Sequence, residues 1–168
     1  MADVDSEIKV DQATYADIFA LEKRQKAFII LQIAKPEGSK VEKVVTKLAM
    51  TNEEVAAAVQ AGSLTVNDKT VALTKKGDET DTWCAFRSAI ATFSIAYGSC
   101  FVDFKTKEGR PTDKLVYVTW TPDGASFKDK MKYSSTKVMK KFSSTPLKYQ
   151  ASNVDDVTYA KITSVVRK

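Results

Sequence analysis

The chain has 168 residues, a formal net charge of +5 and no histidine. Without histidine it cannot carry a Ser-His-Asp or Cys-His catalytic site, or a metal site with a histidine ligand, so most hydrolase classes are excluded. This length predicts a single domain, residues 1–168, with its own core. Cys84 and Cys100 are too few for a disulfide framework, so we expect two buried thiols in a reducing compartment.

The amino-terminal residues 1–7 are acidic and polar, unlike the basic and then apolar start of a secretory signal. All apolar runs are much shorter than the roughly 20 residues that a membrane helix needs. We therefore expect a soluble, cytoplasmic protein.

Helices and strands are predicted to alternate along the chain, without internal repeats. The expected elements are a helix from Asp11, a strand over 27–33, a helical pair within 39–62, a strand over 69–74, a helix over 82–92, strands over 99–104 and 114–120, a helix from Ser126 to Phe142, a strand over 147–151 and a weak helix over 154–165. Such alternation predicts one layered α/β domain.

The segment 39–62 carries two capping-box spacings. The first precedes apolar residues at helical spacing from Val41 to Leu48, which favours a helix, although a strand is possible there. The second begins at Thr51 and precedes an alanine-rich stretch that stops at Gly62, as a helix with a glycine after its last turn would.

Sites of catalysis are not evident. The six glycines form no phosphate-binding loop, so nucleotide hydrolysis is not expected. The acidic pairs at 53–54 and 155–156 lie at expected helix starts, where solvated carboxylates are common. The sequence therefore predicts a protein that is not an enzyme and that needs no cofactor.

The basic charge is concentrated between Lys105 and Lys141, where ten basic and four acidic side chains give a net charge of +6. The rest of the chain sums to −1, so this block is a candidate surface for an acidic partner. Within it, Phe127, Met131, Val138 and Phe142 form one apolar stripe of the predicted helix, with a bend expected at 133–136. This spacing alone favours a buried Met131.

Residues 114–137 read Lys-Leu-Val-Tyr-Val-Thr-Trp-Thr-Pro-Asp-Gly-Ala-Ser-Phe-Lys-Asp-Lys-Met-Lys-Tyr-Ser-Ser-Thr-Lys. This segment closely resembles the signature of the actin-depolymerising factor/cofilin family, in which a strand ending in Trp-x-Pro is followed by Ala-x-x-[KR]-x-Lys-Met-x-Tyr-[AS]-Ser-x-Lys. Residues 6–10, 82–86 and 102–104 are similar to three other family segments, in the family's order. The resemblance covers the chain except residues 37–66.

The resemblance implies an α/β fold: one ADF-homology (gelsolin-like) domain with a mixed sheet flanked by helices on both faces. It also implies a monomeric protein of the actin cytoskeleton that binds actin monomers and filaments and promotes filament depolymerisation and severing. By the resemblance, the residues that contact monomeric actin are Ser6, Lys128, Lys130, Met131, Ser134 and Lys137. This assignment places Met131 on the surface instead of in the core.

Three further roles are implied by the same resemblance. A filament-binding surface would comprise Arg110, Lys114, Arg167 and Lys168. A phosphoinositide-binding surface would comprise Lys128, Lys130, Lys137, Lys140 and Lys141. Ser6 aligns with a serine whose phosphorylation blocks actin binding, and a phosphate there would repel an acidic partner.

Residues 37–66 are predicted to form a helical insertion between the first two core strands, acting either as a passive cap on the sheet or as a functional arm. Two other functions are open. One is a basic module for phosphoinositides or nucleic acid, although Tyr117 and Trp120 are expected in a core strand and offer no base-stacking surface, so no nucleic-acid partner is expected. The other is a relative of glia maturation factor that acts on the actin-nucleating complex.

Overall fold

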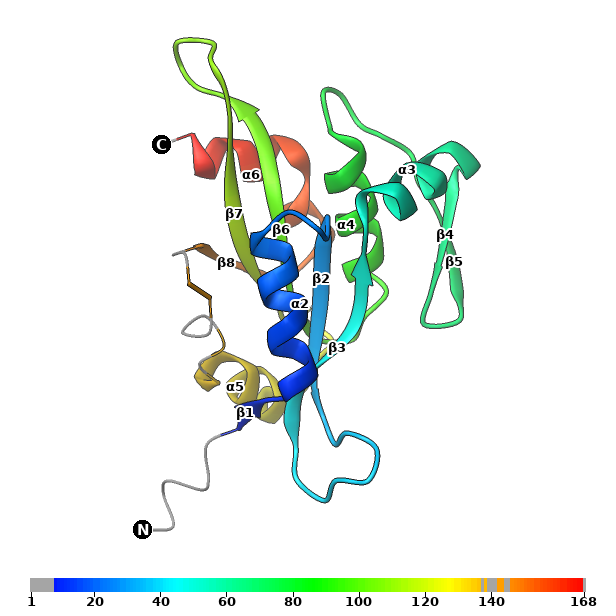
Figure 1. The fold of residues 1–168 in the computed structure, drawn as a ribbon. Coiled ribbons are helices and arrows are strands. Elements are labelled where there is room, and N and C mark those ends of the chain that lie inside the picture. The colour runs from blue at the N-terminus through cyan, green and yellow to red at the C-terminus, as the bar shows by residue number, and fades with distance from the viewer. Residues whose placement is uncertain (1–7, 137, 139–141, 144–145, 168) are drawn as a thin grey trace.

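The structure is a computed structural model that describes residues 8–136, 138, 142–143 and 146–167 (Figure 1). In chain order its elements are β1 (Lys9–Val10), α2 (Gln12–Glu22), β2 (Phe28–Ala34), β3 (Lys43–Met50), α3 (Asn52–Ala61), β4 (Ser63–Val66), β5 (Lys69–Ala72), α4 (Asp81–Ile90), β6 (Ala96–Lys105), β7 (Pro111–Trp120), α5 (Phe127–Ser135), β8 (Leu147–Ala151), the 3-10 helix η2 (Val154–Val157) and α6 (Tyr159–Val166).

A six-stranded mixed sheet with the order β1-β3-β2-β6-β7-β8 forms the centre of the molecule. The four inner strands pair antiparallel with one another, whereas the edge strands pair parallel, β1 with β3 and β8 with β7. The long strands β6 and β7 are paired along their whole length, from Ala96 with Trp120 to Lys105 with Pro111. The predicted strand 147–151 is confirmed at both ends.

Helices cover both faces of this sheet, as predicted. On one face, α2 and Tyr133 of α5 pack on Ile29, Leu31, Tyr97 and Tyr117. On the other face, α4 and α6 pack on apolar side chains that alternate with these along the same strands. In Figure 1, α2 lies in front of the sheet, with α4 and α6 on the far side. The core therefore has two layers, one on each side of the sheet.

The helix predicted from Val41 to Leu48 is wrong, because residues 43–50 form strand β3 between β1 and β2. The register between β2 and β3 shifts between Ile30 and Leu31, so Lys47 is an extra residue in β3. This bulge changes which face successive side chains occupy: Val44 packs with the α2 side of the core and Leu48 with the α4 side. Because the bulge interrupts the strand's alternation of faces, the apolar residues of this segment recur at the spacing expected of a helix.

The remainder of the predicted insertion is partly helical. Thr51 caps α3 through a complete capping box with Glu54, and Gly62 ends the helix in the left-handed conformation with φ of 80°, as predicted. β4 and β5 then form a separate hairpin whose turn residues, Asn67 and Asp68, both have positive φ. A purely helical cap over 37–66 is thus contradicted, because this segment supplies a strand of the central sheet.

The predicted single stripe from Phe127 to Phe142 is also wrong. Helix α5 ends at Ser135, and Thr136 has extended backbone angles. The Thr136 hydroxyl donates to the Lys132 carbonyl, which competes with continuation of the helix. Val138 and Phe142 lie beyond the helix and are buried, whereas Phe127 is 77% exposed. The bend expected at 133–136 is therefore the end of the helix.

Other side chains follow the predictions. Cys84 and Cys100 are buried free thiols, and burial raises the pKa of both. Tyr117 and Trp120 are buried in β7, and the Trp120 indole donates to the Phe93 carbonyl.

Across the described ranges, no helix combines the length and apolar character needed to cross a bilayer.

Candidate functional site

Helix α5 exposes an apolar pair at one end of the molecule. Phe127 and Met131 lie one turn apart and are 77% and 57% exposed. Together with three polar residues of the same helix they border a shallow hollow of about 430 Å³. We call this surface the α5 patch; its residues are Phe127, Lys130, Met131, Ser134 and Ser135.

The start of α5 is defined by local sequence. Pro122 and Gly124 lie in the turn that follows β7, and the Ser126 hydroxyl accepts from the Asp129 amide as the helix cap. Asp129 also places a carboxylate in the first turn, where it is favourable to the helix dipole. The helix is therefore positioned directly after the Trp-Thr-Pro end of β7.

Tyr133 anchors α5 to the sheet on the side opposite the patch. Its hydroxyl accepts from the Ile33 amide at 2.8 Å, and its ring lies 4.9 Å from the Tyr97 ring. The Tyr97 hydroxyl donates to the Tyr133 carbonyl. Burial raises the Tyr133 pKa, and the carboxylates of Asp129 and Glu42 act in the same direction. The side chain is therefore neutral at physiological pH, and it joins α5 to the sheet by packing in the core and by its hydrogen bond to Ile33.

The lysines of α5 have different surroundings. Lys132 forms an ion pair with Glu42 of the β2–β3 connection at 3.1 Å. Within the described part of the chain, Lys128 and Lys130 take part in no ion pair. Their charges are available to an acidic partner, whereas the charge of Lys132 is compensated.

The structure brings together four of the six residues predicted to contact a partner through this surface: Lys128, Lys130, Met131 and Ser134 all lie on α5. Ser6 and Lys137 lie outside the described residues, as do Lys140, Lys141 and Lys168 from the other predicted sets. Phe127 was missed, because the stripe to Phe142 placed it in the core. Phe127 directly precedes Lys128 at the start of a helix rich in lysine, and this position is the sequence signal that could have indicated an exposed side chain.

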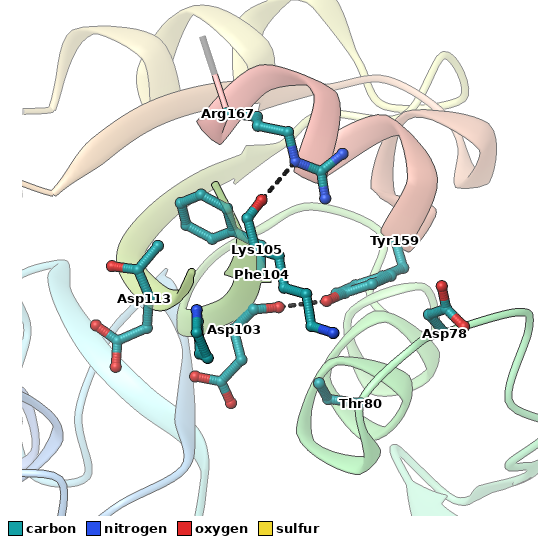
Figure 2. Close-up of a pocket in the computed structure, with 10 residues that line it drawn as sticks. Asp78, Thr80, Asp103, Phe104, Lys105, Asp113, Tyr159 and Arg167 are labelled. Atoms are coloured by element: carbon teal, nitrogen blue, oxygen red, sulfur yellow. Dashed lines mark hydrogen bonds between the residues drawn. The ribbon is translucent and has the colours of Figure 1, made fainter. Parts of the chain in front are cut away.

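A second hollow, of about 720 Å³, lies where the ends of β6 and β7 meet α6 (Figure 2). The Arg167 guanidinium donates to the Lys105 carbonyl at 2.8 Å, and the Tyr159 hydroxyl donates to the Asp103 carbonyl. Figure 2 shows these two bonds joining α6 to the strand on both sides of Phe104. The carboxyl-terminal helix is thereby fixed to the base of the β6–β7 loop.

The described members of the predicted filament surface are Arg110, Lys114 and Arg167. Arg110 is exposed in the β6–β7 loop, and Arg167 contacts the base of that loop. Lys114 instead borders a different hollow of about 470 Å³ beside α2, next to the Arg24–Asp113 ion pair at 2.7 Å. Arg110 and Arg167 are therefore both associated with the β6–β7 loop, whereas Lys114 borders a separate hollow.

Two carboxylates face each other across the same strands. Asp103 and Asp113 are directly paired in the β6–β7 register. Partial burial raises the Asp103 pKa, the Asp113 carboxylate raises it further, and Arg24 opposes the shift. Among the described residues, no group of three or more cysteine, aspartate or glutamate side chains is arranged to hold a metal ion. The α5 patch offers apolar side chains, hydroxyls and a lysine for contact.

Comparison with known proteins agrees with the motif. The family model described as cofilin/tropomyosin-type actin-binding protein matches residues 36–167, including the segment that the motif comparison had left without a counterpart. Actin-depolymerizing factor 4 of Oryza sativa subsp. japonica is 27% identical over 92 residues, which cover 54% of this chain and 66% of that protein. Actin-depolymerizing factor 2 of Arabidopsis thaliana is 31% identical over 72 residues, covering 43% and 53%. The matches thus span half to two thirds of these relatives.

Solved structures share the fold across almost the whole chain. The ADF-like protein UNC-60A of Caenorhabditis elegans has a TM-score of 0.65 at 19% identity, covering 96% of this chain and 95% of that one. Actin depolymerization factor 2 of Plasmodium berghei has a TM-score of 0.60 at 15% identity, covering 95% of each chain. The predicted ADF-homology fold is confirmed. Members of the matched family bind actin and are not enzymes, as expected here, and this chain belongs to the family of cofilin/tropomyosin-type actin-binding proteins.

Proposed function

We propose that this protein binds monomeric actin through the α5 patch and Lys128. The observation that carries the proposal is the exposed pair Phe127 and Met131, which is bordered by lysines without ion-pair partners in the described structure. Adjacent exposed apolar side chains with a polar rim are typical of an interaction site. Methionine adapts to an irregular groove, and lysines beside it pair with the carboxylates of an acidic protein such as actin.

The proposed activity is promotion of filament depolymerisation and severing by binding alone. The relatives named actin-depolymerizing factors support this proposal, as does membership of an actin-binding family. A second contact with a filament is proposed at the opposite end of the sheet, through Arg110 and Arg167, with Lys114 at its edge. Figure 1 shows α5 and the β6–β7 loop at opposite ends of the molecule, so two actin subunits can be contacted from one domain, residues 1–168.

Phosphoinositide binding is proposed as a competing interaction of the same surface. Exposed lysines attract anionic head groups, and Lys128 and Lys130 are the described members of the predicted set. Since both residues also belong to the proposed actin surface, a head group and actin should exclude each other.

The direct test is actin binding by the full chain, measured by co-sedimentation with filaments, by titration of fluorescent monomeric actin and by microscopy of filament length. The variant Lys128→Ala/Lys130→Ala should weaken monomer binding by roughly tenfold, because two charged contacts are removed. The matched control is Lys47→Ala/Lys69→Ala, which removes the same charge from two exposed lysines on β3 and β5.

Three outcomes separate the alternatives. Normal binding by the Lys128→Ala/Lys130→Ala variant would refute the site, and absence of actin binding by the wild type would refute the function. A steeply salt-dependent shift of an oligonucleotide, without competition by actin, would favour a nucleic-acid module.

A further inference from the structure

The connection between β2 and β3, residues 35–42, exposes another large apolar side chain. Val41 is 63% exposed. Figure 1 shows this loop projecting at the same end of the molecule as α5. We call residues 35–42 the β2–β3 loop.

The β2–β3 loop is held in one shape by its own hydrogen bonds. The Ser39 amide donates to the Pro36 carbonyl at 2.9 Å, closing a tight turn in which Gly38 has a φ of 81°. The Ser39 hydroxyl then accepts from the Val41 amide and donates to the Val41 carbonyl, both at 3.1 Å. These hydrogen bonds constrain the backbone that carries Val41.

One contact joins the β2–β3 loop to α5, and a second joins the end of β2 to the same helix. Glu42 directly follows Val41 in the chain. The Lys132 ammonium lies 3.1 Å from one Glu42 carboxylate oxygen and 3.2 Å from the other. The Tyr133 hydroxyl accepts from the Ile33 amide, just before the loop begins. Lys128 lies one helical turn from Lys132, so the flank of α5 that carries Lys128 faces the loop.

We propose that the actin molecule bound by the α5 patch also contacts Val41, and that the Lys132–Glu42 ion pair holds the β2–β3 loop at the distance this joint contact requires. The inference rests on the proposed function and extends the surface from one helix to two elements. Lys132 and Glu42 are positioning residues in this arrangement, and Val41 is a contact residue. Because its own hydrogen bonds constrain the loop, its contact with actin costs less conformational entropy than that of an unconstrained loop.

The first test is the affinity of full-length Val41→Ser for monomeric actin loaded with ADP. Burial of part of a valine side chain predicts a rise in Kd of roughly three- to tenfold, with unchanged thermal stability because Val41 is exposed. Val154→Ser is the matched control: Val154, in η2, is 58% exposed and lies outside the α5 patch and the β2–β3 loop. Its Kd should stay within twofold of wild type.

The second test separates positioning from direct contact. Glu42→Lys breaks the ion pair and should raise Kd several-fold, whereas Glu42→Lys/Lys132→Glu restores a pair of opposite charges and should return Kd to within about twofold of wild type. If the wild type binds actin but Val41→Ser binds equally well, the joint surface is refuted while the α5 patch remains. If the double variant binds as weakly as Glu42→Lys, Lys132 does not act as a tether. If the wild type fails to bind monomeric actin, the proposed function fails and this inference fails with it.

Discussion

Met131 allows the proposed binding surface to be tested with a change that should leave the fold intact. The side chain is 57% exposed on α5, so its truncation opens no cavity in the core. Alanine is also the better helix former, so Met131→Ala should unfold at the same temperature as the wild type or slightly above it. A loss of affinity would then reflect the interface and not stability.

The size of the effect follows from the exposed fraction. Full burial of a methionine side chain contributes about 1.5–3 kcal/mol. Since 57% of Met131 remains exposed in the free protein, docking can add about 0.9–1.7 kcal/mol, which corresponds to a rise in Kd of roughly five- to eighteenfold on truncation. Alanine keeps the Cβ atom, so the lower half of this range is expected.

The assay is equilibrium titration of fluorescent monomeric actin with wild type, Met131→Ala and Met131→Leu. Leucine has a similar volume and apolar surface, so Met131→Leu should bind within about threefold of the wild type. A Kd of Met131→Ala within twofold of wild type would show that actin does not cover this side chain. An equal loss in both variants would show that shape at this position, and not apolar burial, controls the affinity.

Three further predictions concern the core. Gly98→Ala should lower the thermal midpoint markedly, because an added Cβ would lie 2.6 Å from the Phe86 ring and 2.7 Å from Ile90, and overpacking of this kind costs about 1–3 kcal/mol or more; an unchanged midpoint would contradict the packing. Glu79→Ala should lower the free energy of unfolding in urea by about 1.5–3 kcal/mol, because it removes the buried carboxylate that the partly buried Arg87 contacts; a loss below 1 kcal/mol would contradict this role. Tyr117→Phe should be neutral or stabilising in the same assay, since the buried Tyr117 hydroxyl has no hydrogen-bond partner among the described residues, and a clear loss of stability would reveal one.

Local sequence was sufficient to predict several helices and strands and to identify the family. The strand from Phe28 begins with four apolar residues, and the strand ending at Trp120 carries a mostly apolar run from Leu115, so a local pattern identifies each. Helix α3 carries its own start and stop signals in Thr51 and Gly62. The Trp-x-Pro and Lys-x-Lys-Met motifs identified the family and the helix that carries the proposed site, because both are read within one short segment.

Strand β3 and the end of α5 required the tertiary structure. Val44 and Leu48 have a spacing compatible with a helix. Only pairing with β1 and β2 makes this segment a strand, and the bulge at Lys47 lets its side chains reach both layers of the core. Phe127 and Phe142 were equivalent members of one stripe, yet α5 ends between them, so the first is exposed and the second is buried.

By itself, the sequence determined what is encoded over short distances: the family motif, the basic block and the chemistry that the absence of histidine excludes. The tertiary structure decided which lysine charges are free. Lys132 and Lys130 are indistinguishable in a local pattern, but Glu42 compensates Lys132 from 90 positions away in the chain. The reason is that an ion pair depends on distance in space, and strand pairing together with the Tyr133 anchor sets that distance.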